Sequence, residues 1–151
     1  MLRQFLLGGG ISICNIAIHA LVMTTIIRIA RAVGAKTTVY PSLLLIFVLA
    51  STVAVLMMAH TVEVVVWAVA YSNVDVVPPG KGLVYFAFVN YTTLGYGDIV
   101  PEERWQLLGP MTAMNGVLLF GWSTAVIFEV LRRAMTICFP VLSMGQDPDA
   151  R

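Results

Sequence analysis

Long apolar runs separated by short polar segments make up most of this chain. Three of the runs reach the length of about 20 residues that a helix needs to cross a bilayer. They cover about residues 5–27, 42–71 and 105–131. A fourth apolar run, at about residues 83–89, is too short to cross. The pattern therefore predicts three membrane-spanning helices, with a shorter apolar element between the second and the third.

Composition places the chain among membrane proteins. Hydrophobic residues make up 59% of its 151 residues and charged residues 11%, against about 45–50% and 25% in soluble domains. The net charge of +1, without a basic run, gives no sign of a nucleic-acid partner. No cysteine and histidine cluster has metal-ligand spacing, and no nucleophile, base and orienting residue can be assembled. We therefore expect no enzyme, no cofactor and no small-molecule substrate.

Lysine and arginine near the span ends predict the orientation, because cytoplasmic loops carry an excess of them. They gather after the first span and at the end of the third: Arg28, Arg31, Lys36, Arg132 and Arg133. Between the second and third spans, Lys81 and Arg104 are outnumbered by acids. We expect a multi-pass protein of a bacterial-type inner membrane, with its N-terminus outside and a short, disordered cytoplasmic tail.

The sequence TTLGYGD, residues 92–98, follows the short apolar run directly. Irregular backbone at membrane depth is tolerated only where protein buries it or where it lines a watery path. Pro78, Pro79 and Gly80 mark the start of the preceding segment, which has the length and apolarity of a short helix. We expect a re-entrant helix that enters the membrane without crossing, followed by an extended loop that returns outward.

The glycines of this loop suit an ion filter. Such a filter needs successive carbonyls aimed at one axis, and glycine reaches the positive φ that turns alternate carbonyls inward. Gly95 and Gly97 have the required spacing of two. Carbonyls of Thr93, Leu94, Gly95 and Tyr96 would replace the hydration shell of a cation, with the Thr93 hydroxyl at the inner end. One strand cannot surround an ion, so we expect four chains to meet on an axis.

Residues 93–98 closely resemble the potassium channel signature T-[V/I]-G-Y-G-D. The resemblance covers about residues 42–133, the pore module of two-pore-domain-type and bacterial two-helix channels. It implies an all-α membrane protein with an outer helix, a pore helix, a filter and an inner helix, assembled as a homotetramer with K⁺ as the permeant ion. Residues 1–36 would be an additional N-terminal helix and cytoplasmic loop, 37–134 the pore module and 135–151 a cytoplasmic tail.

The chain departs from the family pattern around the filter. Leu94 replaces the usual valine or isoleucine, which removes β-branched stiffness but keeps the carbonyl. Some family members carry a glutamate in the pore helix, whereas this chain has Phe-Val-Asn at residues 88–90. Asp98, expected with Thr92 to support the filter, then needs another partner, and Tyr85 or Tyr91 offers a phenol.

The third span carries inner-helix features by resemblance. Gly116 lies where the family often has a hinge glycine, although Gly116 and Gly121 suit close helix packing equally well. Helical spacing from Gly116 would turn Phe120, Thr124 and Phe128 toward the central cavity, with Phe128 a candidate constriction. The polar residues of this span are expected to form interhelical hydrogen bonds rather than to bind ions: Asn115, Ser123 and Thr124.

Charged and aromatic residues near the span ends allow further predictions. Glu129 precedes two arginines by three and four positions, which suits an exposed helix-end pair or an acidic ring at the inner mouth. An outer acidic ring is expected to concentrate cations: Asp98, Glu102 and Glu103. An outer aromatic belt is expected at the membrane interface: Trp67, Tyr71 and Trp105.

His60 and Glu63 lie three residues apart in the second span, and so on one helix face. Because a carboxylate facing lipid is costly, both should face protein. The pair either pins the second span to the pore helix or supports the filter from behind, where Glu63 replaces the missing pore-helix acid. In the second case a histidine that titrates near neutrality would make the filter sensitive to external pH.

These observations favour a passive, potassium-selective channel. The alternatives are a non-selective cation channel, a non-conducting accessory subunit, or a fragment of a transporter with degenerate filter loops. No helix with repeated arginines indicates a voltage sensor. The gating stimulus is therefore open.

Overall fold

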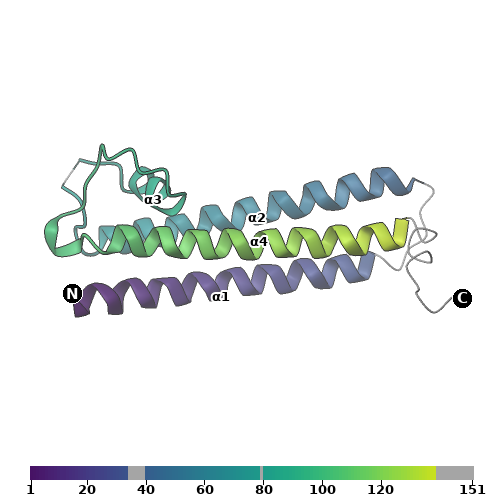
Figure 1. Ribbon diagram of the computed structural model, residues 1–151, viewed down its shortest axis with the longest axis horizontal. Coiled ribbons are helices and arrows are strands. Elements are labelled where there is room, and N and C mark those ends of the chain that lie inside the picture. Colours follow the sequence, from purple (N-terminus) through teal and green to yellow (C-terminus); the bar gives the residue numbers. More distant parts are fainter. Residues whose placement is uncertain (34–39, 79, 139–151) are drawn as a thin grey trace, which may run out of the picture. The chain divides into compact units, whose positions relative to one another are not determined.

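The computed structural model describes residues 1–33, 40–78 and 80–138, and over these residues the chain is helical, without strands. Four α-helices and one 3₁₀ turn follow in order (Figure 1): α1 Leu2–Val33, α2 Pro41–Ser72, α3 Leu83–Tyr91, η1 Glu103–Trp105 and α4 Leu108–Cys138. Most of the predicted tail, and Lys36 of the first loop, lie outside the described residues.

Three helical segments are long and apolar enough to cross a membrane: Leu2–Ala30, Pro41–Ser72 and Glu103–Thr136. The prediction of an all-α membrane protein with three spans is therefore confirmed. The short fourth run forms α3, whose nine residues are too few to cross.

Proline and glycine set the helix boundaries. Pro41 is the first residue of α2 and Pro110 lies in the first turn of α4, where a missing N–H breaks no intrahelical bond. Gly82, in extended conformation with φ −72° and ψ 96°, precedes α3. Pro78 and Gly80 lie in the turn before it, where Gly80 has φ +84°.

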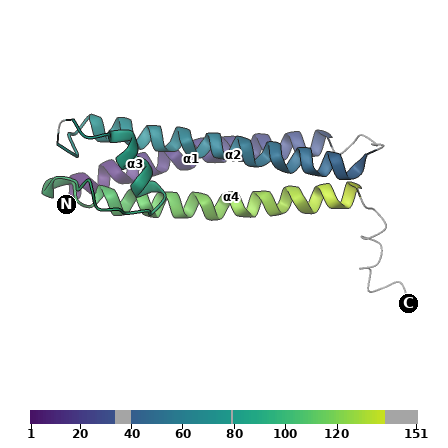
Figure 2. The same cartoon turned by 90° about the horizontal axis from the view of Figure 1, so that it is seen from above.

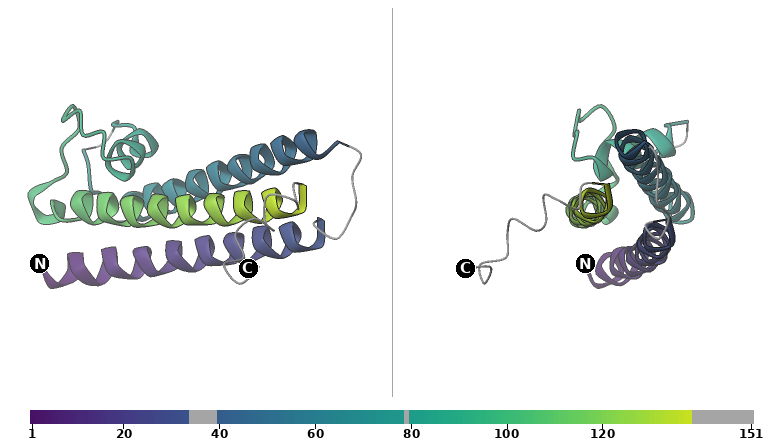
Figure 3. Two further views of the ribbon diagram at one scale, coloured as in Figure 1. Left: turned by 45° about the vertical axis from the view of Figure 1, so that its right-hand side comes forward. Right: turned by 90° about the vertical axis from the view of Figure 1, so that its right-hand side faces the viewer.

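Two compact units make up the chain, and each of the three long helices contributes to both. The first unit combines residues 1–20 with 58–122, and the second combines residues 21–57 with the chain from residue 123 onward. In the first unit α3 lies beside α2 and α4 (Figures 2 and 3). The second unit has a small apolar core: Met23, Ile26, Leu56, Val126 and Val130.

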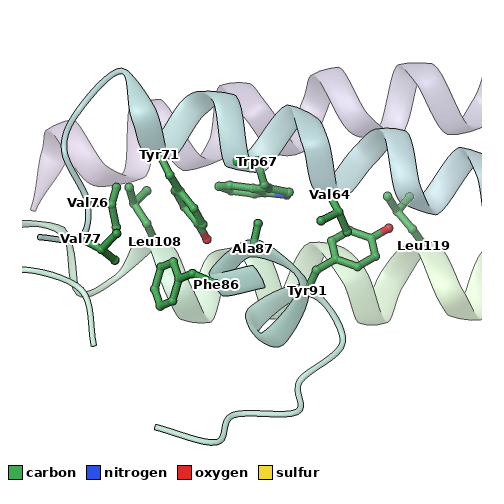
Figure 4. Close-up of a cluster of buried hydrophobic side chains, with 11 residues drawn as sticks. Val64, Trp67, Tyr71, Val76, Val77, Phe86, Ala87, Tyr91, Leu108 and Leu119 are labelled. Carbon is green, nitrogen blue, oxygen red and sulfur yellow. The ribbon is translucent and has the colours of Figure 1, made fainter. Parts of the chain in front are cut away.

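Aromatic side chains form the core of the first unit, between α2, α3 and α4 (Figure 4). Trp67 and Tyr71 are both 0% exposed. The Trp67 Nε1–H donates to Asn115 Oδ1 at 3.1 Å, and the Tyr71 hydroxyl hydrogen-bonds to Thr112. The prediction that these residues form an interfacial aromatic belt is wrong, because α3 and α4 cover them and satisfy their polar atoms.

Trp105, the third residue of that predicted belt, is partly buried and packs against the same core. It lies in the 3₁₀ turn just before α4. The three aromatic residues therefore contribute to the packing of the first unit.

Candidate functional site

The loop TTLGYGD begins at the C-terminus of α3, and hydrogen bonds hold it there. The N–H of Thr92 donates to Phe88 O at 2.9 Å and the N–H of Leu94 donates to Val89 O at 2.9 Å. These bonds use carbonyls that the end of a helix leaves without intrahelical partners. The predicted re-entrant helix and the loop are thus one continuous, internally bonded segment.

The backbone of the loop alternates in sign of φ. Thr93 has φ +60°, Gly95 +60° and Gly97 +77°, so positive φ recurs at every second residue. The two glycines were expected in this conformation, whereas Thr93 was not. A β-branched residue at positive φ is strained, and such strain is typical of functional segments.

Every residue from Thr92 to Asp98 is exposed within the single chain. Leu94 is 53% exposed and Tyr96 68%. The predicted filter residues therefore lie together along one exposed loop, and one chain does not enclose a cation with them.

Asp98, the residue after Gly97, interacts with a residue of α3. The Tyr85 phenol interacts electrostatically with the Asp98 carboxylate. Of the two phenols considered, Tyr85 is the one that interacts with Asp98, whereas the Tyr91 hydroxyl donates to Glu63. The position of each tyrosine on α3 explains the difference. Tyr91 is buried at the end of the helix, while Tyr85 is 43% exposed.

Behind α3, Glu63 and His60 are in contact as their spacing predicted. His60 Nδ1 lies 3.0 Å from Glu63 Oε2 and 2.9 Å from the Tyr91 hydroxyl. Because Tyr91 also donates to Glu63, the pair connects α2 to the last residue of α3. Both interpretations required a contact between this pair and α3, and that contact is present. The pH sensitivity stays a prediction.

Two residues of α1, missed in the sequence analysis, complete this cluster. His19 Nδ1 lies 2.7 Å from Glu63 Oε1. The Asn15 amide donates to the Glu63 backbone carbonyl and to Asn115 Oδ1, at 3.2 Å in each case. The sequence could have indicated Asn15 and His19, because they are polar residues four positions apart in an apolar span and so lie on one helix face. The interhelical role expected for Asn115 is confirmed.

Gly116 is a close-packing position. A Cβ there would lie 2.0 Å from the Tyr91 carbonyl oxygen, whereas a Cβ on Gly121 would meet nothing within 4 Å. The end of α3 therefore rests directly on the backbone of α4 at Gly116. Of the two roles considered for Gly116, the packing role has a direct contact to support it.

The three residues predicted to face a central cavity, Phe120, Thr124 and Phe128, have different surroundings. In the first unit, the Phe120 ring packs against those of His60 and Tyr91, with centroids 4.5 and 5.4 Å away. In the second unit, Thr124 and Phe128 are exposed, Phe128 to 66%. Phe120 therefore packs within its own chain, while the lining roles of Thr124 and Phe128 stay predictions.

The acidic residues near the span ends are paired or exposed. Glu129 accepts from Arg132 at 2.9 and 3.0 Å and also from Arg133, as expected of a helix-end pair. Glu102 lies 3.6 Å from Arg104, and all the acids of the predicted outer ring are exposed.

Between the two last helices that are long enough to cross a membrane, α2 and α4, the chain places the short helix α3 and a glycine-containing loop. A family described as ion channel matches residues 42–133, and the chain belongs to that family. The match runs from α2 to α4 and leaves α1 outside. No curated protein and no solved structure matches the chain. The family points to transport rather than to enzymatic catalysis.

Proposed function

We propose that the chain is one subunit of a homotetrameric, potassium-selective channel in a bacterial-type inner membrane, with its N-terminus outside and its C-terminus in the cytoplasm. One observation carries the proposal: positive φ recurs at Thr93, Gly95 and Gly97 in the segment that joins α3 to α4. Alternating backbone of this kind is what a row of carbonyls aimed at one axis requires, and such rows replace the hydration shell of K⁺.

Thr93, Leu94, Gly95 and Tyr96 would hold the ion through their carbonyl oxygens. The C-terminus of α3 supports this role, because it ends at Tyr91, two residues before Thr93. A helix C-terminus carries about half a negative elementary charge, which stabilises a cation near the start of the filter. The interaction between Tyr85 and Asp98 would hold the other end of the loop near the same helix.

Exposed apolar surface supports assembly from several chains. Leu94 and Tyr96 are more than half exposed within the chain, as are Met114, Val117 and Leu118 of α4. Large apolar side chains exposed in this way indicate contact with lipid or protein. A carbonyl cage around one ion needs four such strands, so we infer that the filter segment and α4 line the fourfold axis.

Reconstitution tests the proposal. Purified protein should have the mass of four 16.4 kDa chains, and its reversal potential in a planar bilayer should follow the K⁺ gradient, with Rb⁺ permeant and Na⁺ largely excluded. Ba²⁺ should block, because it matches K⁺ in size at twice the charge. Equal Na⁺ and K⁺ permeability would indicate a non-selective cation channel, and an assembled tetramer without current would indicate an accessory subunit.

A further inference from the structure

Three side chains that can bind a metal converge in the first unit, apart from the filter. His19 of α1 and His60 and Glu63 of α2 each offer one ligand atom, and these atoms all lie within 4.8 Å of one another. His19 and Glu63 are 0% exposed and His60 8%. Two imidazoles and a carboxylate are a ligand set typical of Zn²⁺ and related divalent transition metals.

Both histidines direct the same ring atom toward one carboxylate. Nδ1 of His19 lies 2.7 Å from Glu63 Oε1, and Nδ1 of His60 lies 3.0 Å from Oε2. The Tyr91 oxygen is a fourth candidate, 2.9 Å from His60 Nδ1. Two ligand atoms that each lie about 2.0–2.2 Å from a tetrahedral zinc ion are roughly 3.3 Å apart. The ligand-atom spacings of 2.7 to 4.8 Å bracket that separation, so small side-chain shifts would form the site.

The charge of the cluster also favours a cation. Glu63 is a fully buried carboxylate in a span of the membrane, where an uncompensated charge is costly. Within the described part of the chain, no lysine or arginine pairs with it, and its side-chain partners are the two histidines and the Tyr91 hydroxyl. A divalent ion supplies positive charge at this point.

We propose that His19, His60 and Glu63 bind one divalent transition-metal ion of the Zn²⁺ type, with the Tyr91 oxygen in the fourth position. The ion ties α1 and α2 to the last residue of α3. It thereby gives α1, which the family match leaves out, a direct connection to the segment that precedes the filter.

Titration with Co²⁺ tests this site, because its visible absorption distinguishes a tetrahedral protein site from the hydrated ion. The full chain, purified in detergent and stripped with a chelator, should bind one Co²⁺ per chain with a tetrahedral spectrum that Zn²⁺ abolishes. His19→Gln and His60→Gln should each weaken binding by at least about tenfold, since even the loss of an outer partner of a metal ligand costs about 10–100-fold. Cys14→Ser is the matched control: Cys14 is exposed on α1 and should leave binding unchanged.

A second variant separates loss of a ligand from loss of the fold. His19→Cys restores a metal ligand, so it should bind Cd²⁺ where His19→Gln does not. The proposal is overturned if the wild-type chain binds no Co²⁺, if the two glutamine variants bind it as tightly as wild type, or if only Cys14→Ser abolishes binding. Because these measurements need no ion current, their outcome is independent of the proposed function.

Discussion

The backbone of Gly116 lies against the carbonyl oxygen of Tyr91, so closely that a Cβ at position 116 would come within 2.0 Å of it. The residue that ends the pore helix and donates its hydroxyl to Glu63 is thus also in contact with α4. A change at Gly116 is therefore expected to move the pore helix, and the filter segment with it.

We expect Gly116→Ala to destabilise the protein. Because the contacting atom belongs to the backbone, α3 or α4 must shift, and overpacking of this kind costs about 1–3 kcal/mol. Thermal unfolding in detergent and the size of the purified assembly would report the effect. The control is Gly121→Ala on the same helix, whose Cβ would meet nothing within 4 Å. Equal stability of the two variants would contradict the packing role.

Gly95→Ala and Gly97→Ala should each abolish selective K⁺ flux while leaving membrane insertion intact. Both glycines have positive φ, and a Cβ in that conformation costs roughly 1–2 kcal/mol per residue, in each subunit. Reversal potentials in bilayers provide the measurement. Gly10→Ala in α1, where a Cβ meets nothing within 4 Å, should conduct like wild type. Unchanged selectivity in either filter variant would mean that this loop is not the filter.

Tyr91→Phe should lower the free energy of unfolding by about 1–3 kcal/mol, because it leaves the buried Glu63 carboxylate without one of its donors. Denaturant unfolding in micelles with a chelator present measures this loss apart from any metal effect. Combining the change with Glu63→Gln gives a double-mutant cycle. The two changes should be clearly non-additive, whereas additive losses would show that the hydroxyl does not stabilise the carboxylate.

Tyr85→Phe should reduce the ratio of K⁺ to Na⁺ permeability without affecting the fold. Tyr85 is 43% exposed, so little packing is lost, but Asp98 loses the phenol hydroxyl of α3 with which it interacts. Phe88→Leu is a suitable control, since Phe88 lies on α3 with a similar exposure of 39%. If Tyr85→Phe retains full selectivity, the interaction between Tyr85 and Asp98 is dispensable for the filter.

The sequence predicts well those features of the protein that depend only on neighbouring residues, namely the membrane spans and the glycine conformations of the loop. Bilayer thickness is a fixed length, so the number of consecutive apolar residues identifies the three spans without knowledge of their partners. The spacing of Gly95 and Gly97 similarly indicates alternating backbone, because positive φ is a property of single residues. Thr93 was missed since its positive φ depends on how the loop is attached to α3.

Only the tertiary structure decided which distant residues meet. Glu63 contacts Tyr91 across 28 positions and His19 across 44, and Asn15 reaches Asn115 across 100. Periodicity places each of these residues on a face of its own helix, but the packing of one helix on another selects the partner. For the same reason Trp67 and Tyr71 are buried, although Trp and Tyr are residue types common at membrane interfaces. The sequence indicates only their amphipathic character, whereas α3 packs over them in the folded chain.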